Sequence, residues 1–360
     1  MCLACHPAID PAKQNAFAEQ LLEILNHGAT SLLISIGHRT GLFDVMSDGA
    51  ARTSAELAEE AGLNERYVRE WLAGLLVGRI IDTDPVTRKY RLPLEHGRCL
   101  SRKSPTDNMA VFAQYLPTLA QAEDRLVECF RHGGGVPYEA YPRFHEVMAE
   151  DSGQSVVPMI ATGVVELFPG LRERLEAGID VLDVGCGRGL ALMKLAETYP
   201  HSRFVGYDLS AEAIQTASEM AGRKHLRNIR FEQKDLTLWE ELESFDWITA
   251  LDAIHDQAKP DVVLAAIHRA LRKGGFFLMQ DIDASSEPAE NINHPIGALL
   301  YTVSCMHCMT VSLAQGGMGL GAMWGVQAAE TMLRDAGFTD IHIHRFPHDV
   351  QNAYFVIRKS

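Results

Sequence analysis

The spacing of apolar residues divides the chain into a helical N-terminal part and a C-terminal part in which strand and helix patterns alternate. Over residues 13–47, apolar side chains at helical spacing predict a helix that ends in a turn at Gly41; they are Phe17, Leu21, Leu22, Leu25, Leu32, Leu33 and Ile36. Residues 101–175 have a mostly helical but irregular pattern, broken by the string RHGGGVPYEAYP. Beyond residue 176 the alternation predicts a parallel sheet that helices cover on both faces.

Residues 50–100 predict a winged helix. Thr53 and Glu56 have the spacing of a capping box, and Gly62 supplies the stop signal for the helix that begins there. After a short turn, a second amphipathic helix carries apolar residues from Val68 to Leu76. The strings IIDTD and KYRL flank Pro85 and predict the two strands of a wing.

Seven strands are predicted in the C-terminal part, at Asp180–Val184, Arg203–Asp208, Ile229–Gln233, Trp247–Leu251, Phe276–Gln280, and near Ile341–His344 and Tyr354–Ile357. We therefore expect an α/β chain in three parts: a helical and winged-helix domain in residues 1–100, a helical connector in residues 101–175, and a Rossmann-like domain in residues 176–360. Residues 285–325 interrupt this last domain as an insertion.

The string VLDVGCGRGLALMKLAETYP carries the most chemical information. A buried strand leads directly into Gly185, Gly187 and Gly189, and a helix follows. Glycines let the backbone approach a ligand closely, and the N-terminus of a helix presents free N–H groups. The spacing is G-x-G-x-G, not the G-x-G-x-x-G of dinucleotide sites, and Asp183 precedes the first glycine by two residues. A carboxylate there suits a cationic cofactor better than a pyrophosphate.

Further acids follow the next strands in order. Asp208, 21 residues past Gly187, ends the second strand, where a carboxylate can accept hydrogen bonds from ribose hydroxyls. Asp235 follows the third strand, where it can accept from an adenine amine, and Asp252 ends the fourth. The string HRALRKGGFFLMQD then gives a helix, a turn and a fifth strand.

Over residues 176–284 these linked features resemble class I S-adenosylmethionine-dependent methyltransferases. The resemblance implies a seven-stranded sheet with a reversed last hairpin. It places Asp183, Gly185, Gly187 and Gly189 at the methionine part of the cofactor and Asp208 with Leu209 at its ribose. It places Asp235 with Leu236 at its adenine, and Asp252 at the methionine ammonium group or the substrate.

The string AIHDQAKPDVVLAAIHRALRKGG resembles the region of small-molecule O-methyltransferases that contains His-Asp-Trp, with Gln257 in place of the tryptophan. In that family the histidine is the general base. The resemblance therefore makes His255 the candidate base, with Asp256 beside it and Asp281 as the acid that orients it. An imidazole is suited to take the proton of a hydroxyl acceptor as the methyl group arrives.

The expected activity is methyl transfer to a small-molecule acceptor, with oxygen as the preferred atom. The alternatives are an N- or S-methyltransferase that relies on proximity, and a cofactor-sensing, DNA-binding regulator without catalysis. The whole chain also resembles an uncharacterised group of bacterial winged-helix methyltransferases found in actinobacteria. We expect residues 285–325 to cover the acceptor site.

Composition and charge limit the partners. The 360-residue chain has a formal net charge of −14, and residues 51–100 hold eight Arg or Lys against eight Asp or Glu, which argues against nucleic acid. The winged helix resembles the region that builds the homodimer of O-methyltransferases. With no run of 18 wholly apolar residues and no signal peptide, we expect no membrane span and a cytoplasmic protein.

The seven cysteines are expected to be reduced thiols. Cys2 and Cys5 form one C-x-x-C pair, with His6 beside it, and Cys305 and Cys308 form another. A zinc site that drew on both pairs would join residues some 300 positions apart, so the sequence predicts no metal site. The role of Cys305 and Cys308 stays open at this point.

Overall fold

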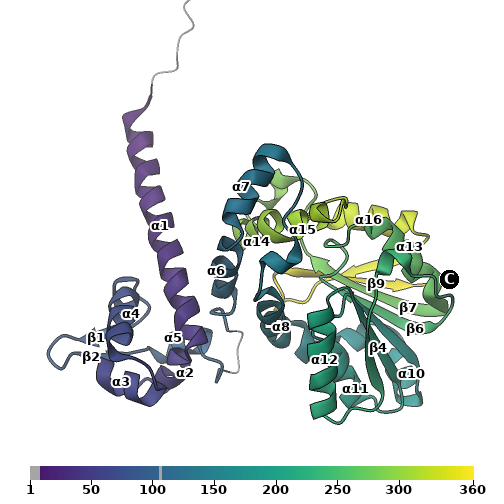
Figure 1. Cartoon of the computed structure of the whole chain (residues 1–360), viewed down its shortest axis with the longest axis horizontal. Coiled ribbons are helices and arrows are strands. Elements are labelled where there is room, and N and C mark those ends of the chain that lie inside the picture. The colour runs from purple at the N-terminus through teal and green to yellow at the C-terminus, as the bar shows by residue number, and fades with distance from the viewer. Residues whose placement is uncertain (1–8, 105–107) are drawn as a thin grey trace, which may run out of the picture. The chain divides into compact units, whose positions relative to one another are not determined.

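The computed structural model describes residues 9–104 and 108–360, which form two compact units (Figure 1). One unit runs to Pro117 and the other spans Thr118–Ser360. The pair Cys2 and Cys5, together with His6, lies outside the described residues.

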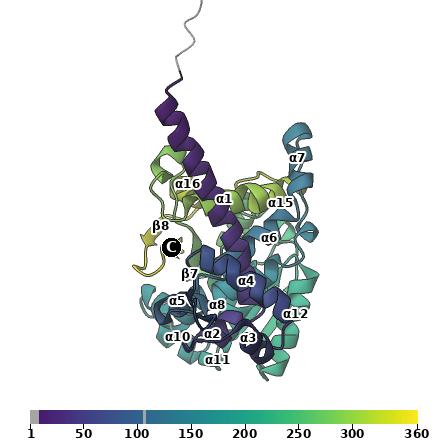
Figure 2. The same ribbon diagram turned by 90° about the vertical axis from the view of Figure 1, so that its left-hand side faces the viewer.

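A single long helix opens the first unit, as the apolar spacing predicted. Helix α1 (Pro11–Arg39) begins where the Asp10 side chain accepts hydrogen bonds from two backbone N–H groups, and Figure 2 shows its length clearly. Gly41 has φ +74°, so the chain turns there before the short helix α2 (Leu42–Met46). Most of the predicted apolar stripe of α1 is exposed, with Phe17 at 58% and Leu25 at 69% of full exposure.

The two helices and two wing strands predicted within residues 50–100 are present, with shorter strands than the strings IIDTD and KYRL suggested. In α3 (Ser54–Ala61) both hydrogen bonds of the capping box form, and Gly62 ends the helix with φ +65°. Helix α4 (Glu65–Val77) follows, and β1 (Asp82–Asp84) pairs antiparallel with β2 (Lys89–Arg91) as the wing. Helix α5 (Leu94–Leu100) and a short turn at Phe112–Gln114 complete the unit. The Trp71 indole donates to the Leu33 carbonyl at 2.8 Å, which fixes α4 against α1.

The second unit is built on a seven-stranded sheet in the order β5-β4-β3-β6-β7-β9-β8. The strands are β3 (Asp180–Val184), β4 (Arg203–Asp208), β5 (Ile229–Gln233), β6 (Phe245–Leu251), β7 (Leu271–Ile282), β8 (Asp340–His344) and β9 (Asn352–Arg358). Only β9 runs against its neighbours, so the predicted sheet and its reversed last hairpin are confirmed. The chain leaves β3 toward β4 and β5 and later returns to β6, so a crevice opens at the carboxyl ends of β3 and β6.

Alternate residues of each strand point to opposite faces, and helices bury both faces. On one face, Leu182, Ile248 and Phe277 pack against α13 (Pro260–Ala270) and α16 (Val326–Asp335). On the other, Val181, Trp247 and Leu278 pack against α10 (Leu171–Ala177) and α11 (Leu190–Thr198). Helix α12 (Ala211–Arg223) contributes Ala217 and Ala221 to a smaller cluster. The short apolar strands are thus the central layer of a three-layer unit.

The expected connector contributes to this second unit. From Thr118 onward its residues belong to the sheet unit. They include the end of α6 (Tyr115–Ala120), and all of α7 (Glu123–His132), α8 (Phe144–Gln154) and α9 (Val156–Met159). Part of the expected insertion forms α14 (Gly297–Val303), a π-helical turn at Ser304–Cys308 and α15 (Met309–Ala314).

One helical stretch, Gly297–Ala314, is long and apolar enough to cross a membrane, which the sequence prediction did not anticipate. It contains Ser and Thr residues as well as His307 and carries no charged side chain. Inside the structure, 44% of the stretch is buried, and core helices pass the same test, so the stretch is weak evidence for a membrane span.

Candidate active site

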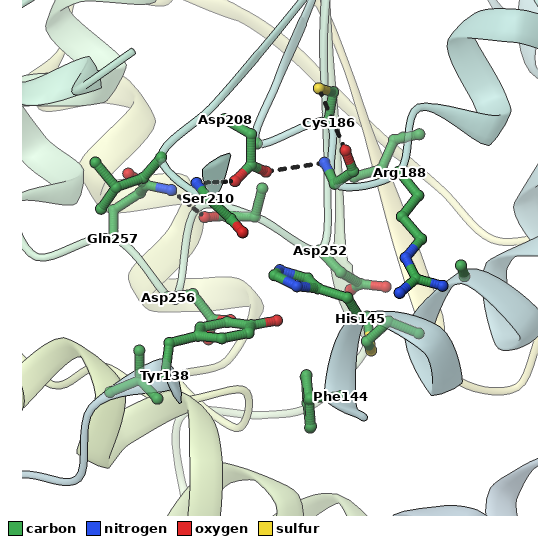
Figure 3. Close-up of a pocket in the computed structure, with 18 of the residues that line it drawn as sticks. Tyr138, Phe144, His145, Cys186, Arg188, Asp208, Ser210, Asp252, Asp256 and Gln257 are labelled. Carbon is green, nitrogen blue, oxygen red and sulfur yellow. Dashed lines mark hydrogen bonds between the residues drawn. The ribbon is translucent and has the colours of Figure 1, made fainter. Parts of the chain in front are cut away.

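A pocket of about 820 Å³ opens at the carboxyl ends of β3, β4 and β6, where the sequence placed the cofactor (Figure 3). Ten of the predicted site residues line it: Asp183, Gly185, Gly187, Gly189, Asp208, Leu209, Asp235, Leu236, Asp252 and Asp256. They lie at the ends of four strands, β3, β4, β5 and β6, so parallel strand ends bring together residues that are far apart in the sequence.

The glycine loop needs its glycines for different reasons. Gly185 and Gly189 both have φ near +70°, where a side chain is strained. A Cβ at Gly185 would also lie 2.5 Å from the Ala253 Cβ, and one at Gly189 would lie 2.4 Å from the Phe231 ring. A Cβ at Gly187 would have no atom within 4 Å. Glycine is favoured at this position by its φ of +51° and by the close approach of a ligand.

Asp208 joins this loop to the next strand. Its carboxylate accepts from the Gly187 N–H at 2.9 Å and from the Ser210 N–H at 2.8 Å, as Figure 3 shows. Each oxygen of an ionised carboxylate has a further lone pair, so both can still accept from a ligand. At the other end of the pocket, Asp235 accepts hydrogen bonds from the backbone N–H and the hydroxyl of Thr237. The neighbouring Leu236 is buried.

Two carboxyls that line the pocket, Asp183 and Asp252, have a raised pKa. Burial raises the pKa of Asp183 to about 7, although the Thr249 hydroxyl donates to it at 2.7 Å and opposes the rise. Burial, together with the charge of Asp281, raises the pKa of Asp252 to about 8. Gln280 donates to one oxygen of Asp252 at 2.8 Å, while the other oxygen has no partner among the described residues. A positive charge in the pocket would stabilise the ionised form of both.

His255 lies behind the pocket wall, so the candidate base does not itself line the cavity. Its Nδ1 is 2.7 Å from the Asp281 Oδ1, and its Nε2 is 3.2 Å from the Asp256 Oδ1. Burial alone lowers the pKa of His255, but the charges of Asp281 and Asp256 outweigh it and raise the pKa well above its usual value. Of the three candidate catalytic residues, Asp256 is the one that reaches the pocket.

An aromatic wall from the connector closes the opposite side. Tyr138, Phe144 and His145 line the pocket, and Tyr138 stacks on His145 with ring centroids 4.5 Å apart. His145 also pairs with Glu212, which in turn pairs with Arg188 of the glycine loop. Sequence reasoning missed all these residues, because the connector matches no named motif and its aromatics are separated from the loop by some 40 positions.

Residues 285–325, which we expected to cover the acceptor site, contribute fewer residues to the pocket lining than the connector does. Val311, Ala314 and Gln315 from this segment line the pocket at the end of α15. Cys308 lies deeper, buried beside His255 and Asp256, while Cys305 is partly exposed.

Comparisons with known proteins agree with this fold. Residues 175–337 match a family model described as a methyltransferase domain, and residues 28–102 match an Rv2258c-like winged HTH domain. The chain therefore carries a methyltransferase domain behind a winged helix, as the sequence predicted, and the winged helix is of the actinobacterial type.

Individual relatives are more distant. A fatty-acid O-methyltransferase of Mycolicibacterium smegmatis is 31% identical over 29% of this chain and 37% of its own length. The chain spans less than half the length of the curated relatives that it matches.

Among solved structures, human N-acetylserotonin methyltransferase in complex with SAM is similar with a TM-score of 0.68 and 19% identity, over 98% of this chain and 99% of that one. An O-methyltransferase family protein from Burkholderia thailandensis has a TM-score of 0.68 and 17% identity, over 95% and 98%. At these identities the likeness shows the fold.

Proposed function

We propose that the protein transfers the methyl group of S-adenosylmethionine to a hydroxyl oxygen of a small-molecule acceptor. One observation carries the proposal: a single cavity joins the glycine loop and Asp208 to the carboxyls of Asp252 and Asp256 and to the aromatic wall. Such a cavity offers a cofactor cradle and, continuous with it, room for a second molecule. The O-methyltransferases among its relatives and structural neighbours support oxygen over the N- or S-methyl and non-catalytic alternatives.

The residues divide along the cofactor. We assign Asp208 with Leu209 to the ribose hydroxyls and Asp235 with Leu236 to the adenine. We assign the glycine loop, with Asp183 below it, to the methionine part. The unpartnered oxygen of Asp252 is then available to the ammonium group, which supplies the positive charge that this buried carboxyl lacks.

Methyl transfer is an in-line displacement in which the cofactor supplies the electrophile. The acceptor oxygen forms a bond to the methyl carbon as the sulfur–carbon bond breaks, and that electron pair stays on sulfur as a neutral thioether. The hydroxyl proton has to leave the acceptor and pass to the protein or to water. The chain's own task is therefore alignment of the two molecules and activation of the oxygen.

We assign this activation to the cluster of His255, Asp256 and Asp281. Asp256 faces the pocket, and His255 lies between it and Asp281, held by the 2.7 Å hydrogen bond. The Trp324 indole donates to the same Asp281 oxygen at 3.0 Å and fixes the carboxylate. In this arrangement Asp281 is a positioning residue, while Asp256 is the member that can touch an acceptor.

Asp208→Ala should raise the dissociation constant for S-adenosylmethionine by roughly 10-fold or more, because a charge-assisted hydrogen bond contributes about 1.5–3 kcal/mol. Isothermal calorimetry measures this directly. Asp261→Ala, an exposed acid at the start of α13, is the matched control and should bind as wild type does. Equal cofactor affinity in the two variants would show that Asp208 does not bind the cofactor.

The activity itself is tested by incubating the protein with methyl-labelled cofactor and a metabolite extract. We expect label to appear in a small molecule through a bond to oxygen, identified by mass spectrometry. Absence of cofactor binding in calorimetry, or label found only on nitrogen or sulfur, would contradict the proposal.

We also propose a cytoplasmic homodimer, with a second copy covering α1. Large apolar side chains on this helix are exposed: Phe17, Leu21, Leu22, Ile24, Leu25, Leu32 and Ile36. So large an apolar surface is unusual on a monomer. Light scattering should give twice 39.8 kDa, and the double variant Leu21→Glu, Leu25→Glu should give 39.8 kDa. A monomeric wild type at micromolar concentration would refute the dimer.

A further inference from the structure

We propose that His255, Asp256 and Cys308 form a binding site for a divalent transition-metal ion, with zinc as the ion that fits best. One ligand atom from each, an imidazole nitrogen, a carboxylate oxygen and a sulfur, lie within 4.8 Å of one another. Two ligands of a tetrahedral zinc ion, at about 2.0–2.1 Å from the metal, lie a little over 3 Å apart. The 3.2 Å between His255 Nε2 and Asp256 Oδ1 matches that spacing.

The pair of atoms at 3.2 Å does not form a hydrogen bond. Asp256 Oδ1 is buried and has no hydrogen-bond partner among the described residues, although it lies beside the ring nitrogen. When the ring is protonated the two atoms form an ion pair, and a divalent cation that replaces the ring proton would lie between them and bind both. Cys308 is 4% exposed and interacts with both residues, so it closes the third side of this space.

The surroundings also match those of a metal-binding histidine. Such a histidine donates its second ring N–H to a carboxylate, which fixes the tautomer and aims the free nitrogen at the metal. Here Nδ1 pairs with Asp281 at 2.7 Å, and the Trp324 indole holds the same Asp281 oxygen. The second possible trio, Asp252, His255 and Asp281, would have to break that bond, so the Cys308 trio is preferred.

The donor set selects the ion. A nitrogen, a sulfur and an oxygen ligand suit zinc, whereas magnesium and calcium prefer oxygen alone. Three protein ligands also leave one position open, as in catalytic zinc sites, and Asp256 lines the pocket. If the proposed methyl transfer is correct, an ion here would polarise the acceptor hydroxyl and ease the loss of its proton. This role rests on the proposed function, but metal binding itself does not.

The test uses the full-length protein, stripped with a chelator and titrated with Co²⁺ as a spectroscopic probe and with Zn²⁺ as a competitor. We expect one equivalent to bind, with an intense near-ultraviolet band from thiolate ligation that zinc removes. Cys308→Ala should lose the band and weaken binding by at least about 100-fold, beyond the usual loss for a residue behind the ligands. Cys305→Ala, three positions away, is the matched control and should keep the band and the wild-type affinity for the metal.

Calorimetry with S-adenosylmethionine on the same samples checks that each variant is folded, and Cys308→Ser serves where alanine does not fold. No stoichiometric cobalt or zinc binding by wild type, or equal binding by the Cys308 variants, overturns the metal site. Metal binding without cofactor binding would instead refute the proposed function and leave the metal site standing.

Discussion

Replacing His255 by alanine is expected to lower turnover on the true acceptor by roughly 10²–10⁴-fold while leaving cofactor affinity nearly intact. His255 holds the centre of the activating cluster, with Asp281 on one ring nitrogen and Asp256 on the other. Without the ring, Asp256 and Asp281 lose the partner that pairs with both, so Asp256 is no longer held in place beside the acceptor. The cofactor residues on the loops after β3, β4 and β5 keep their contacts, and Asp252, after β6, keeps its hydrogen bond from Gln280.

Turnover is measured on the acceptor found with labelled cofactor, and affinity by calorimetry. His342→Ala, an exposed histidine on β8, is the control and should turn over as wild type does. Asp281→Asn should reduce turnover less than His255→Ala, since it keeps the ring but loosens its position. A His255→Ala variant with wild-type turnover would leave only proximity and orientation as the source of catalysis, and would favour a nitrogen or sulfur acceptor.

Asp183→Asn is expected to make the cofactor-free protein markedly more stable at pH 8, with a gain in stability that becomes smaller toward pH 5. Burial raises the pKa of Asp183 to about 7, from its ordinary value of 3.8. Well below pH 3.8 the carboxyl is protonated in both the folded and the unfolded state. As the pH rises toward 7 the unfolded chain releases its proton while the folded protein keeps it, so stability falls. The whole shift is worth on the order of 4 kcal/mol at 1.36 kcal/mol per unit.

The measurement is denaturant unfolding at pH 5, 6, 7 and 8, following the transition that S-adenosylmethionine stabilises. Asp180→Asn, in the same strand, is the matched control, because the Arg203 hydrogen bond lowers the pKa of that carboxyl below the tested range. It should shift stability equally at every pH. The cationic cofactor favours ionised Asp183, so wild-type affinity should also rise with pH through about 7. If the stability of the Asp183→Asn variant changed with pH as steeply as that of wild type, the raised pKa of Asp183 would be refuted.

Local sequence was sufficient wherever neighbouring residues decide the structure. The capping box at Thr53 and Glu56, the stop at Gly62 and the strands Asp180–Val184, Arg203–Asp208 and Ile229–Gln233 form as predicted, because caps, turns and strand periodicity depend on residues a few positions apart. The glycine loop was equally visible, since its spacing and the preceding acid are contiguous.

Contacts between distant segments were decided by the tertiary structure alone. Asp281 meets His255 across 26 positions, and Cys308 reaches the same ring from another helix, so the sequence could not pair them. The aromatic wall around Tyr138 and the exposure of the α1 stripe likewise depend on how whole elements pack. Hydrophobic spacing determines which face of an element is apolar, whereas the chemistry of this pocket depends on which side chains the folded chain brings within bonding distance.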